Sequence, residues 1–144
     1  MLIEDILLNK DNSLVTIGPD AAVADVVATL TEHNIGALPV CDGDGALVGI
    51  ISERDVVRNI ARQGDSVLDL RISDVMTKDV VTCTPADDAN DVMGVMKGNR
   101  IRHVPVVTDG RVINMVSARD AMVAMLEESL EQRRTLATAY EIVR

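Results

Sequence analysis

The chain has 144 residues, a mass of 15.5 kDa and a formal net charge of −9, from 14 basic and 23 acidic side chains. This length allows one core or two tightly fused halves, and the acidity disfavours binding to nucleic acids and to anionic membranes. With no Phe or Trp and one tyrosine, Tyr140, the chain lacks an aromatic platform for stacking nucleic-acid bases. The apolar runs have strand length and no signal-type segment is recognised, so we expect a cytoplasmic protein without membrane contact.

Apolar patterning predicts five elements in the first half. Short apolar runs beside Gly, Pro and Asp residues indicate strands, and apolar residues spaced three and four apart indicate amphipathic helices. The expected elements are a strand over residues 14–17, a helix over 22–33, strands over 37–41 and 47–51, and a helix over 52–62. Pro39 lies inside the second strand, which favours an edge or an interrupted ladder over a central strand.

The second half repeats this order and ends in a longer helix. A helix is expected after Asp88, which suits an N-cap position, and strands are expected over residues 103–107 and 111–116. The final helix is expected to begin at Ser117 and to extend to the C-terminus. Its apolar stripe passes the end of the repeat, which is typical of packing on the other half or on another subunit.

An internal repeat relates the two halves. Five residues recur 66 positions later: Thr16, Pro19, Asp25, Ile35 and Pro39 return as Thr82, Pro85, Asp91, Ile101 and Pro105. After a loop that differs by one residue, Ser52, Arg54 and Asp55 recur 65 positions later, and the lead-in segment 3–7 is echoed at 72–76. A tandem duplication with small gaps in its loops explains this register.

The repeat centres on a Ser-x-x-Asp motif where an apolar run gives way to a helix. A helix N-terminus presents free backbone N–H groups, so a Ser hydroxyl and an Arg beside it suit an anion such as phosphate. The same pattern is also a capping box, in which Ser caps the helix and the acidic side chain reaches back. Both interpretations stay open, because phosphate can displace a cap at the same helix end.

Only two cysteines are present, Cys41 and Cys83, too few for a disulfide framework and without a zinc-site spacing. We expect both to be buried thiols that pack as small apolar groups. One alternative is a disulfide formed under oxidation. Another is a metal or redox sensor that would also use His33 and His103.

The order of elements, the doubled Thr…Pro segment, the stretch Ile101-Arg-His-Val-Pro-Val106 and the two Gly/Asn-x-x-Ser-x-x-Asp motifs closely resemble a tandem pair of cystathionine β-synthase (CBS) domains. The resemblance covers about residues 2–123. It implies an α/β (α+β) fold of two pseudo-twofold-related β-α-β-β-α repeats packed through their sheets, known as a Bateman module. We expect repeat 1 with its lead-in over residues 1–69, repeat 2 over 70–125 and a helical extension over 126–144.

The resemblance also implies two clefts for adenosyl ligands between the repeats. In the family the Asp of the motif holds the ribose hydroxyls, the Ser and nearby basic residues hold phosphate, and the early Thr and the residues before the strand Pro line the base. By position, the first cleft would use Ala37, Leu38, Ser52, Arg54, Asp55, Thr82, Pro85 and Ile101. The second would use Thr16, Pro19, Ile35, Arg102, His103, Ser117, Arg119 and Asp120.

The two clefts are expected to differ. Arg102 and His103 align with small residues of the first half, so the second cleft should carry more positive charge and be the better phosphate site. Asn114 replaces Gly49 at the head of the second motif, where a side chain would narrow or re-aim the pocket.

These features favour a ligand-binding sensor over an enzyme. The sequence carries no phosphate loop, dinucleotide fingerprint, Ser elbow or His/Cys cluster, so neither a metal nor a required cofactor is expected. We expect a homodimer that binds AMP, ADP, ATP or NAD(H), with S-adenosylmethionine ranked lower, and that signals occupancy to an unknown regulated partner. The alternative is a structural or interaction module whose clefts bind no nucleotide.

Overall fold

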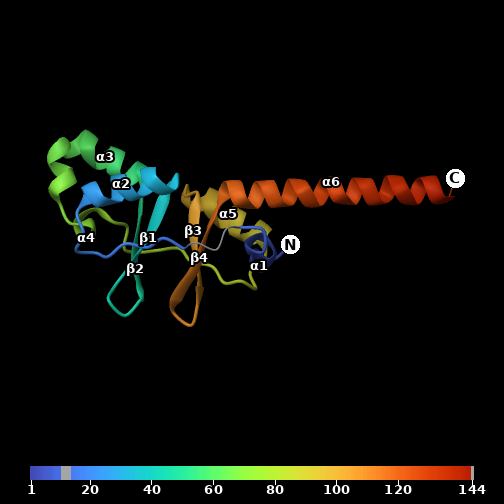
Figure 1. Ribbon diagram of the computed structural model, residues 1–144, viewed down its shortest axis with the longest axis horizontal. Helices are drawn as coiled ribbons and strands as arrows, with labels where there is room; N and C mark the ends of the chain where they lie inside the picture. The colour runs from blue at the N-terminus through green and yellow to red at the C-terminus, as the bar shows by residue number, and fades with distance from the viewer. Residues whose placement is uncertain (11–13, 144) are drawn as a thin grey trace.

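The computed structural model describes residues 1–10 and 14–143, and each half forms a two-stranded antiparallel hairpin flanked by helices (Figure 1). The elements up to residue 69 are α1 (Ile3–Leu7), α2 (Val23–His33), β1 (Ala37–Cys41), β2 (Leu47–Ser52), α3 (Glu53–Gln63) and the 3₁₀ helix η1 (Asp65–Asp69). The later elements are α4 (Ile72–Val75), α5 (Ala89–Asn99), β3 (His103–Thr108), β4 (Arg111–Ser117) and α6 (Ala118–Val143). The mixed α/β class expected from the sequence is confirmed.

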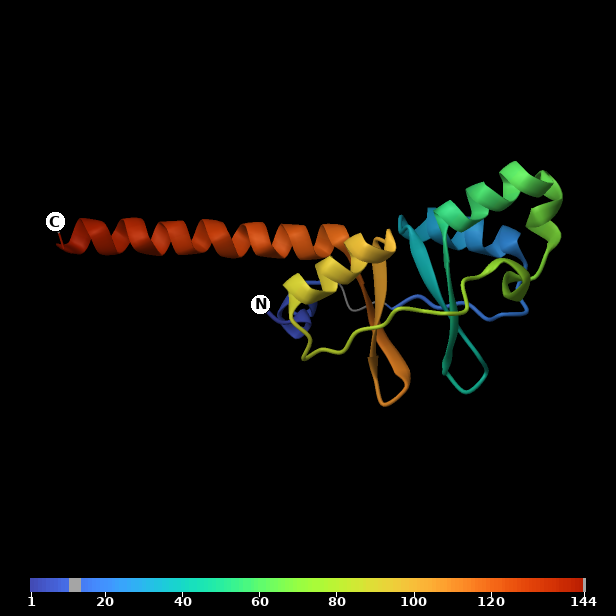
Figure 2. The same ribbon diagram turned by 180° about the vertical axis from the view of Figure 1, so that it is seen from behind.

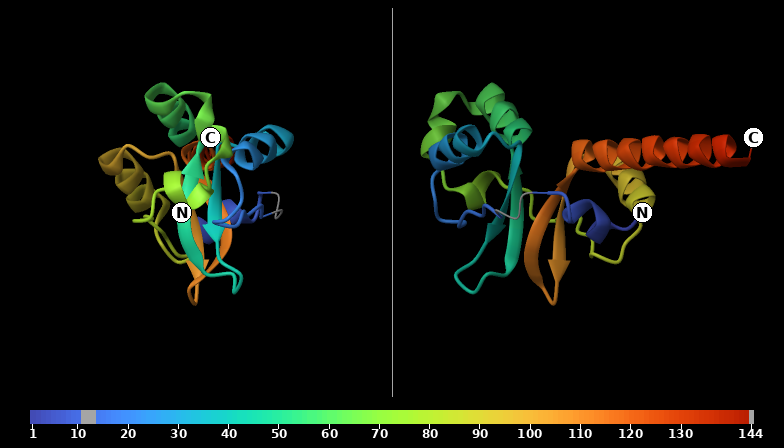
Figure 3. Two further views of the ribbon diagram at one scale, coloured as in Figure 1. Left: turned by 90° about the vertical axis from the view of Figure 1, so that its left-hand side faces the viewer. Right: turned by 45° about the vertical axis from the view of Figure 1, so that its right-hand side comes forward.

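The two hairpins face each other at the centre of the molecule, with the helices on the outside (Figure 3). β1 pairs with β2 so that Ala37 lies opposite Ser52, and β3 pairs with β4 so that His103 lies opposite Ser117. The registers correspond, so each Ser-x-x-Asp motif begins where the second strand of a hairpin passes into a helix. The expected packing of two repeats through their sheets is confirmed.

The first strand expected in each half is reduced to a single bridging residue. Ile17 makes two backbone hydrogen bonds to β1, one of them from its N–H to the Pro39 carbonyl at 3.2 Å. Extending this ladder would require an N–H from Pro39 or Pro19, which proline lacks. The strand predicted over residues 14–17 is therefore wrong, while the interrupted ladder is confirmed. The same bridge recurs at Cys83, again between two prolines.

The lead-in helices are exchanged between the halves. Ile3 and Ile6 of α1 are buried in the core of the second half, whereas Ile72 of α4 is buried in the core of the first. Backbone hydrogen bonds hold α1 at the Pro85 carbonyl and α4 at the Pro19 carbonyl. Figure 1 shows α1 beside α5 and α4 beside α2. Each core is therefore completed by a helix from the other half of the chain.

Helix α6 leaves the body of the molecule and extends away from it (Figure 2). Ala121 in its first turns is 1% exposed, but Leu126 and Tyr140 are 60% and 69% exposed. Within residues 1–10 and 14–143, the apolar stripe of α6 does not pack on the other half of the chain. Of the two partners expected for this stripe, another subunit is the one that is left. Over the same residues, no helix combines the length and hydropathy that crossing a membrane requires.

Candidate functional site

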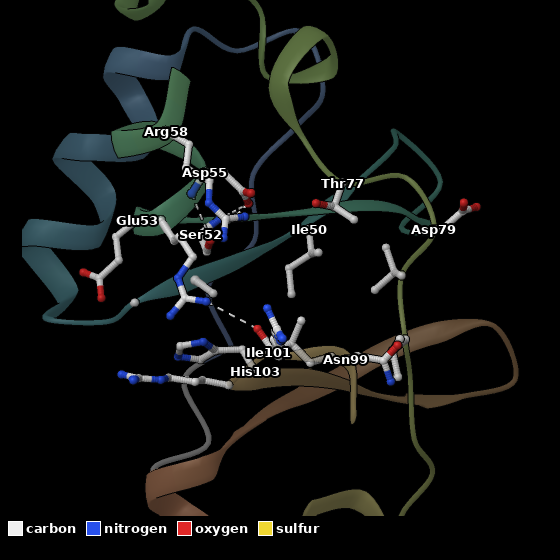
Figure 4. Close-up of a pocket in the computed structure, with 17 residues that line it drawn as sticks. Ile50, Ser52, Glu53, Asp55, Arg58, Thr77, Asp79, Asn99, Ile101 and His103 are labelled. Carbon is white, nitrogen blue, oxygen red and sulfur yellow. Dashed lines mark hydrogen bonds between the residues drawn. The ribbon is translucent and has the colours of Figure 1, made fainter. Parts of the chain in front are cut away.

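A cleft of ≈ 360 Å³ opens between the two repeats at the first Ser-x-x-Asp corner. The first repeat contributes the start of β1, the end of β2 and the start of α3. The second repeat contributes the segment that follows α4 and the connection from α5 to β3. In Figure 4, Ser52 and Asp55 lie across the cleft from Ile101 and His103, and Thr77 lies on the connecting segment at one flank. Residues from both repeats are therefore needed to form the cleft.

The first corner is a complete capping box at the start of α3. The Asp55 N–H donates to Ser52 Oγ at 3.2 Å, and the Ser52 N–H donates to Asp55 Oδ2 at 2.9 Å. The Ser52 hydroxyl donates to the same Oδ2 at 3.0 Å. The helix-cap interpretation of the motif is confirmed here, and the same two side chains line the cleft.

The cleft is positively charged although the chain is acidic. Four arginines, Arg54, Arg58, Arg100 and Arg102, line it against three carboxylates, whereas the whole chain carries −9. Arg54 donates from Nη1 to the Arg100 carbonyl at 3.3 Å and so connects the two repeats. Arg58 lies one helical turn after Arg54, on the same side of α3. The arrangement supplies the local positive pocket that an anionic ligand requires.

His103 packs over the backbone of Gly36. A Cβ atom at Gly36 would lie 3.0 Å from His103 Cε1 and 3.2 Å from Nε2, so a side chain there would crowd the ring. Burial lowers the pKa of His103, and the nearby ammonium group of Lys10 lowers it further. The imidazole is therefore favoured in its neutral form, which offers one hydrogen-bond donor and one acceptor.

The second corner has the same capping box but an additional partner. The Ser117 N–H donates to Asp120 Oδ2 at 2.9 Å, and the Asp120 N–H donates to Ser117 Oγ at 3.0 Å. Lys10, from the segment after α1, places its Nζ 2.7 Å from the same Oδ2. Burial would raise the pKa of Asp120, but the hydrogen bonds from Lys10 and Ser117 hold it below its ordinary value. This carboxylate is therefore already paired with a cation of its own chain.

In the first corner, a glycine lets the segment after α4 approach β2. Ile50 exchanges two backbone hydrogen bonds with Thr77, at 3.0 and 2.9 Å. A Cβ atom on the neighbouring Gly49 would lie 2.4 Å from Met76 Sδ and 3.0 Å from the Thr77 carbonyl oxygen. The close approach therefore depends on glycine at this position.

In the second corner, Asn114 stands where the first has this glycine. Its Oδ1 accepts the Met115 N–H at 2.8 Å, and Lys10 Nζ donates to the Met115 carbonyl. The two backbone groups that pair with a neighbouring segment in the first corner are thus both satisfied by side chains in the second. The substitution at the head of the motif therefore changes which groups satisfy the backbone at this corner.

The cleft brings together seven of the sixteen residues assigned by position. They are Ala37, Ser52, Arg54, Asp55, Ile101, Arg102 and His103. By position, Arg102 and His103 are expected in the second cleft, whereas the structure places both in the lining of the first. The reason is that their connection from α5 to β3 faces the start of α3 across the hairpins.

The other assigned residues lie elsewhere. Leu38 is fully buried in the first core, and Thr82 lines a separate cavity of ≈ 230 Å³ beside α5. Thr16 is exposed and Ile35 packs against the first core. The two prolines, Pro19 and Pro85, accept hydrogen bonds from the lead-in helices, and Ser117, Arg119 and Asp120 belong to the second corner.

Several residues of the two corners were missed from the sequence. Arg58 could have been found from its four-residue spacing to Arg54, which places both on one helical face. Lys10 has no comparable signal in the sequence, although the shift that aligns residues 3–7 with 72–76 also aligns Lys10 with Asp79. Asp79 lines the first cleft, so the two corners carry opposite charges at this matched position.

Both cysteines are free thiols. Cys83 is 4% exposed, and burial together with the charge of Asp87 raises its pKa to about 11. Cys41 is half-buried, and burial followed by the charge of Asp42 raises its pKa. The expected buried thiol is confirmed for Cys83, whereas Cys41 is partly exposed. In the part of the chain that the structure describes, no group of three or more His, Cys, Asp or Glu side chains is placed to hold a metal ion.

Comparison with known proteins finds the same duplicated unit. The family model of the CBS domain matches residues 3–62 and 72–127. The chain is 38% identical over 142 residues to the CBS domain-containing protein CBSX3, mitochondrial, of Arabidopsis thaliana, and the match covers 93% of this chain and 69% of that protein.

Solved structures agree with this comparison. The CBS-domain containing protein ATU1752 from Agrobacterium tumefaciens is 40% identical with a TM-score of 0.82, over 86% of this chain and 92% of that one. The CBS domain pair of protein MJ0100, in complex with 5′-methylthioadenosine and S-adenosyl-L-methionine, is 28% identical with a TM-score of 0.79, over 89% and 98% of the two chains.

Proposed function

Because the chain belongs to the CBS domain family and carries the domain twice, we propose that it is a regulatory module that binds an adenine nucleotide between its repeats. The observation that carries the proposal is one cleft of ≈ 360 Å³ that combines Asp55 at a helix N-terminus with four arginines. Small-ligand pockets have volumes of about 300–1,000 Å³. Ligand occupancy would reach a regulated partner as a shift between conformational states of the pair.

Each part of a nucleotide has a matching group in the cleft. The carboxylate of Asp55 accepts hydrogen bonds from the ribose hydroxyls, and charged acceptors form stronger hydrogen bonds than neutral ones. The guanidinium groups of Arg54 and Arg58 and the start of α3 attract phosphate. Aliphatic side chains, including Ile50 and Ile101, provide the walls for a purine.

The choice among adenosyl ligands follows from the charge of the cleft. Protein MJ0100 was crystallised with 5′-methylthioadenosine and S-adenosyl-L-methionine, which supports an adenosine-type ligand for this fold. S-Adenosylmethionine carries a sulfonium cation, which four lining arginines would repel, whereas they attract phosphate. We therefore rank AMP, ADP, ATP and NAD(H) above S-adenosylmethionine.

Calorimetric titration of AMP, ATP and NAD into the full chain tests the proposal. Asp55→Ala is expected to weaken AMP binding roughly 10- to 150-fold, because it removes a charged hydrogen bond worth about 1.5–3 kcal/mol. Arg58→Met is expected to weaken AMP but not adenosine. Asp69→Ala, an exposed carboxylate in η1 outside the cleft, serves as the matched control. Absence of binding by the wild type at millimolar ligand would contradict the proposal.

A structural or interaction module remains the second candidate, because the capping boxes alone account for both Ser/Asp pairs. Thermal unfolding separates the two functions. A nucleotide present at 100 times its Kd should add about 2.7 kcal/mol to the free energy of unfolding, and a purely structural module gains nothing.

The remaining parts of the proposal concern assembly, location and chemistry. We propose a homodimer of these pairs, tested by sedimentation, and a cytoplasmic location, tested by cell fractionation. We also propose that the protein acts by binding and not by catalysis. Unchanged AMP or ATP after prolonged incubation with the protein, followed by chromatography, would agree with this.

A further inference from the structure

Lys10 joins the segment after α1 to the second corner through two contacts. Its Nζ lies 2.7 Å from Asp120 Oδ2 and also donates to the Met115 carbonyl. The side chains of Lys10 and Asp120 are 27% and 28% exposed, so the pair is shielded from most solvent. At the first corner the corresponding position by the lead-in repeat is Asp79, which cannot make such a contact to Asp55.

The ammonium group occupies one of the two oxygens that Asp120 could offer to a ribose hydroxyl, and it neutralises the charge of the carboxylate. Oδ2 accepts a backbone N–H at both corners, but its second donor is the Lys10 ammonium at Asp120 and only the neutral Ser52 hydroxyl at Asp55. A ribose hydroxyl that donates to Asp120 must compete with this cation, and a neutral hydroxyl forms the weaker bond. Displacement would also leave the Met115 carbonyl without Lys10 as its donor.

We propose that Lys10 is a built-in cation that closes the second corner, so that one chain binds one nucleotide at the first cleft. The inference rests on the proposed function and identifies the residue that selects between the two corners. The selecting residue lies in the lead-in of the first half but acts on the motif of the second, because the lead-in helices are exchanged.

Calorimetry with AMP as the probe tests the role of Lys10 on the full chain. The wild type should bind one AMP per chain, and the Lys10→Met variant should bind two. Adding Asp120→Asn to Lys10→Met should return the stoichiometry to one. Lys10→Gln, which keeps hydrogen-bond donors but not the charge, should open the second site with lower affinity. Lys97→Met, an exposed lysine on α5, is the matched control and should bind one.

The outcomes distinguish this inference from the proposed function. Two AMP molecules per wild-type chain, one of them lost in Asp120→Asn, would overturn the role of Lys10 and leave the proposed function intact. No binding by the wild type but one AMP per chain in Lys10→Met would support Lys10 and contradict the proposed first cleft. A folded Lys10→Met or Lys10→Gln protein with unchanged stoichiometry overturns the inference.

A separate observation concerns the exposed part of α6. Apolar residues recur at alternating spacings of three and four along it, and four of them are Val123, Leu126, Leu130 and Tyr140, exposed by 45%, 60%, 47% and 69%. This is the a/d spacing of a coiled coil, and between residues 123 and 140 Arg133 is its one charged position. A 26-residue helix is about 39 Å long, enough for several such layers.

Charged residues beside this a/d seam, formed by residues 123, 126, 130, 133, 137 and 140, indicate which partner helix packs on it and in which orientation. Glu127 and Arg134 occupy the same heptad position, seven residues apart. An antiparallel second copy places Glu127 opposite Arg134 of the second copy, twice by symmetry, whereas a parallel copy places each charge opposite an uncharged residue. We infer that α6 pairs with α6 of a second copy in antiparallel orientation.

Sedimentation of the full chain tests this pairing. The wild type should be a dimer at micromolar concentration, and Leu126→Lys with Leu130→Lys should be a monomer of unchanged helicity. Arg134→Glu should weaken dimerisation about tenfold or more, and Glu127→Arg with Arg134→Glu should restore it. A monomeric wild type, as expected if a different protein covers the seam, overturns the inference. Insensitivity of the dimer to Leu126→Lys with Leu130→Lys also overturns it.

Discussion

The two Ser-x-x-Asp corners share their local structure and differ in their surroundings. Both carry the same pair of cap hydrogen bonds, between 2.9 and 3.2 Å, at the start of a helix. The first borders a cleft lined by arginines, whereas the second holds the ammonium group of Lys10. A duplicated motif therefore fixes the helix start, while residues outside the motif decide what reaches it.

The largest expected effect comes from giving the first corner the residue of the second. Gly49→Asn forces a side chain against Met76 and the Thr77 carbonyl. It should lower the free energy of unfolding by about 3 kcal/mol, the upper end of the usual cost of overpacking, and weaken AMP binding. Chemical denaturation measures the first effect. Gly43→Asn, where no atom lies within 4 Å of an added Cβ, should change stability far less. Equal losses in the two variants would contradict the role of Gly49.

Neutralising the motif carboxylate should destabilise the second corner more than the first. Asp120→Asn leaves the Lys10 ammonium without its charged partner and should cost about 1.5–3 kcal/mol, while Asp55→Asn, which keeps an oxygen for the cap, should cost about 0.5–1.5 kcal/mol. Urea denaturation of the ligand-free proteins measures both. If Asp55→Asn proved the more damaging, the ion pair at the second corner would not contribute as described.

Acid unfolding reports on the same pair. The pKa of Asp120 is held below its ordinary value of 3.8, so its contribution to stability is present above that pH and is lost as the pH falls through the folded-state pKa. Lys10→Met removes a hydrogen bond that lowers this pKa, so the loss should begin at higher pH. Circular dichroism during acid titration follows the change, with Lys97→Met as the control.

The smallest expected effect is on His103, which lies between the corners. Its pKa lies below the ordinary 6.5, because burial and Lys10 both disfavour the charged form. The unfolded state therefore binds more protons just below pH 6.5, and stability falls as the pH decreases there. Lys10→Met should raise the pKa of His103 in an NMR titration, with His33 as the one other imidazole signal. An unchanged pKa would contradict the influence of the Lys10 charge on His103.

The sequence predicted the features that depend on local pattern. Hairpins, helix caps and the register of the two motifs follow from apolar periodicity and from residues such as Asp88, whose side chain accepts the Asn90 N–H. The strand predicted over residues 14–17 does not form, because its ladder requires N–H groups at positions that proline occupies. The pattern of apolar residues does not record this requirement.

The features that were missed depend on contacts between distant segments. Neither the exchange of α1 and α4 nor the contact between Lys10 and Asp120 has a local signature. The bonded residues are about 50 positions apart for α4, about 80 for α1 and 110 for Lys10. The placement of Arg102 and His103 beside the first cleft differs from the expected one for the same reason. Position in the repeat gave their strand correctly but not the cleft that the strand faces.

The exchange of the lead-in helices has a consequence for how this duplicated protein can be divided. A fragment that ends at residue 69 would lack Ile72, and one that starts at residue 70 would lack Ile3 and Ile6. Each fragment would expose an empty apolar groove where the missing helix belongs. The ancestral single repeat is therefore no longer present as a separable piece, and the pair should melt in a single cooperative transition.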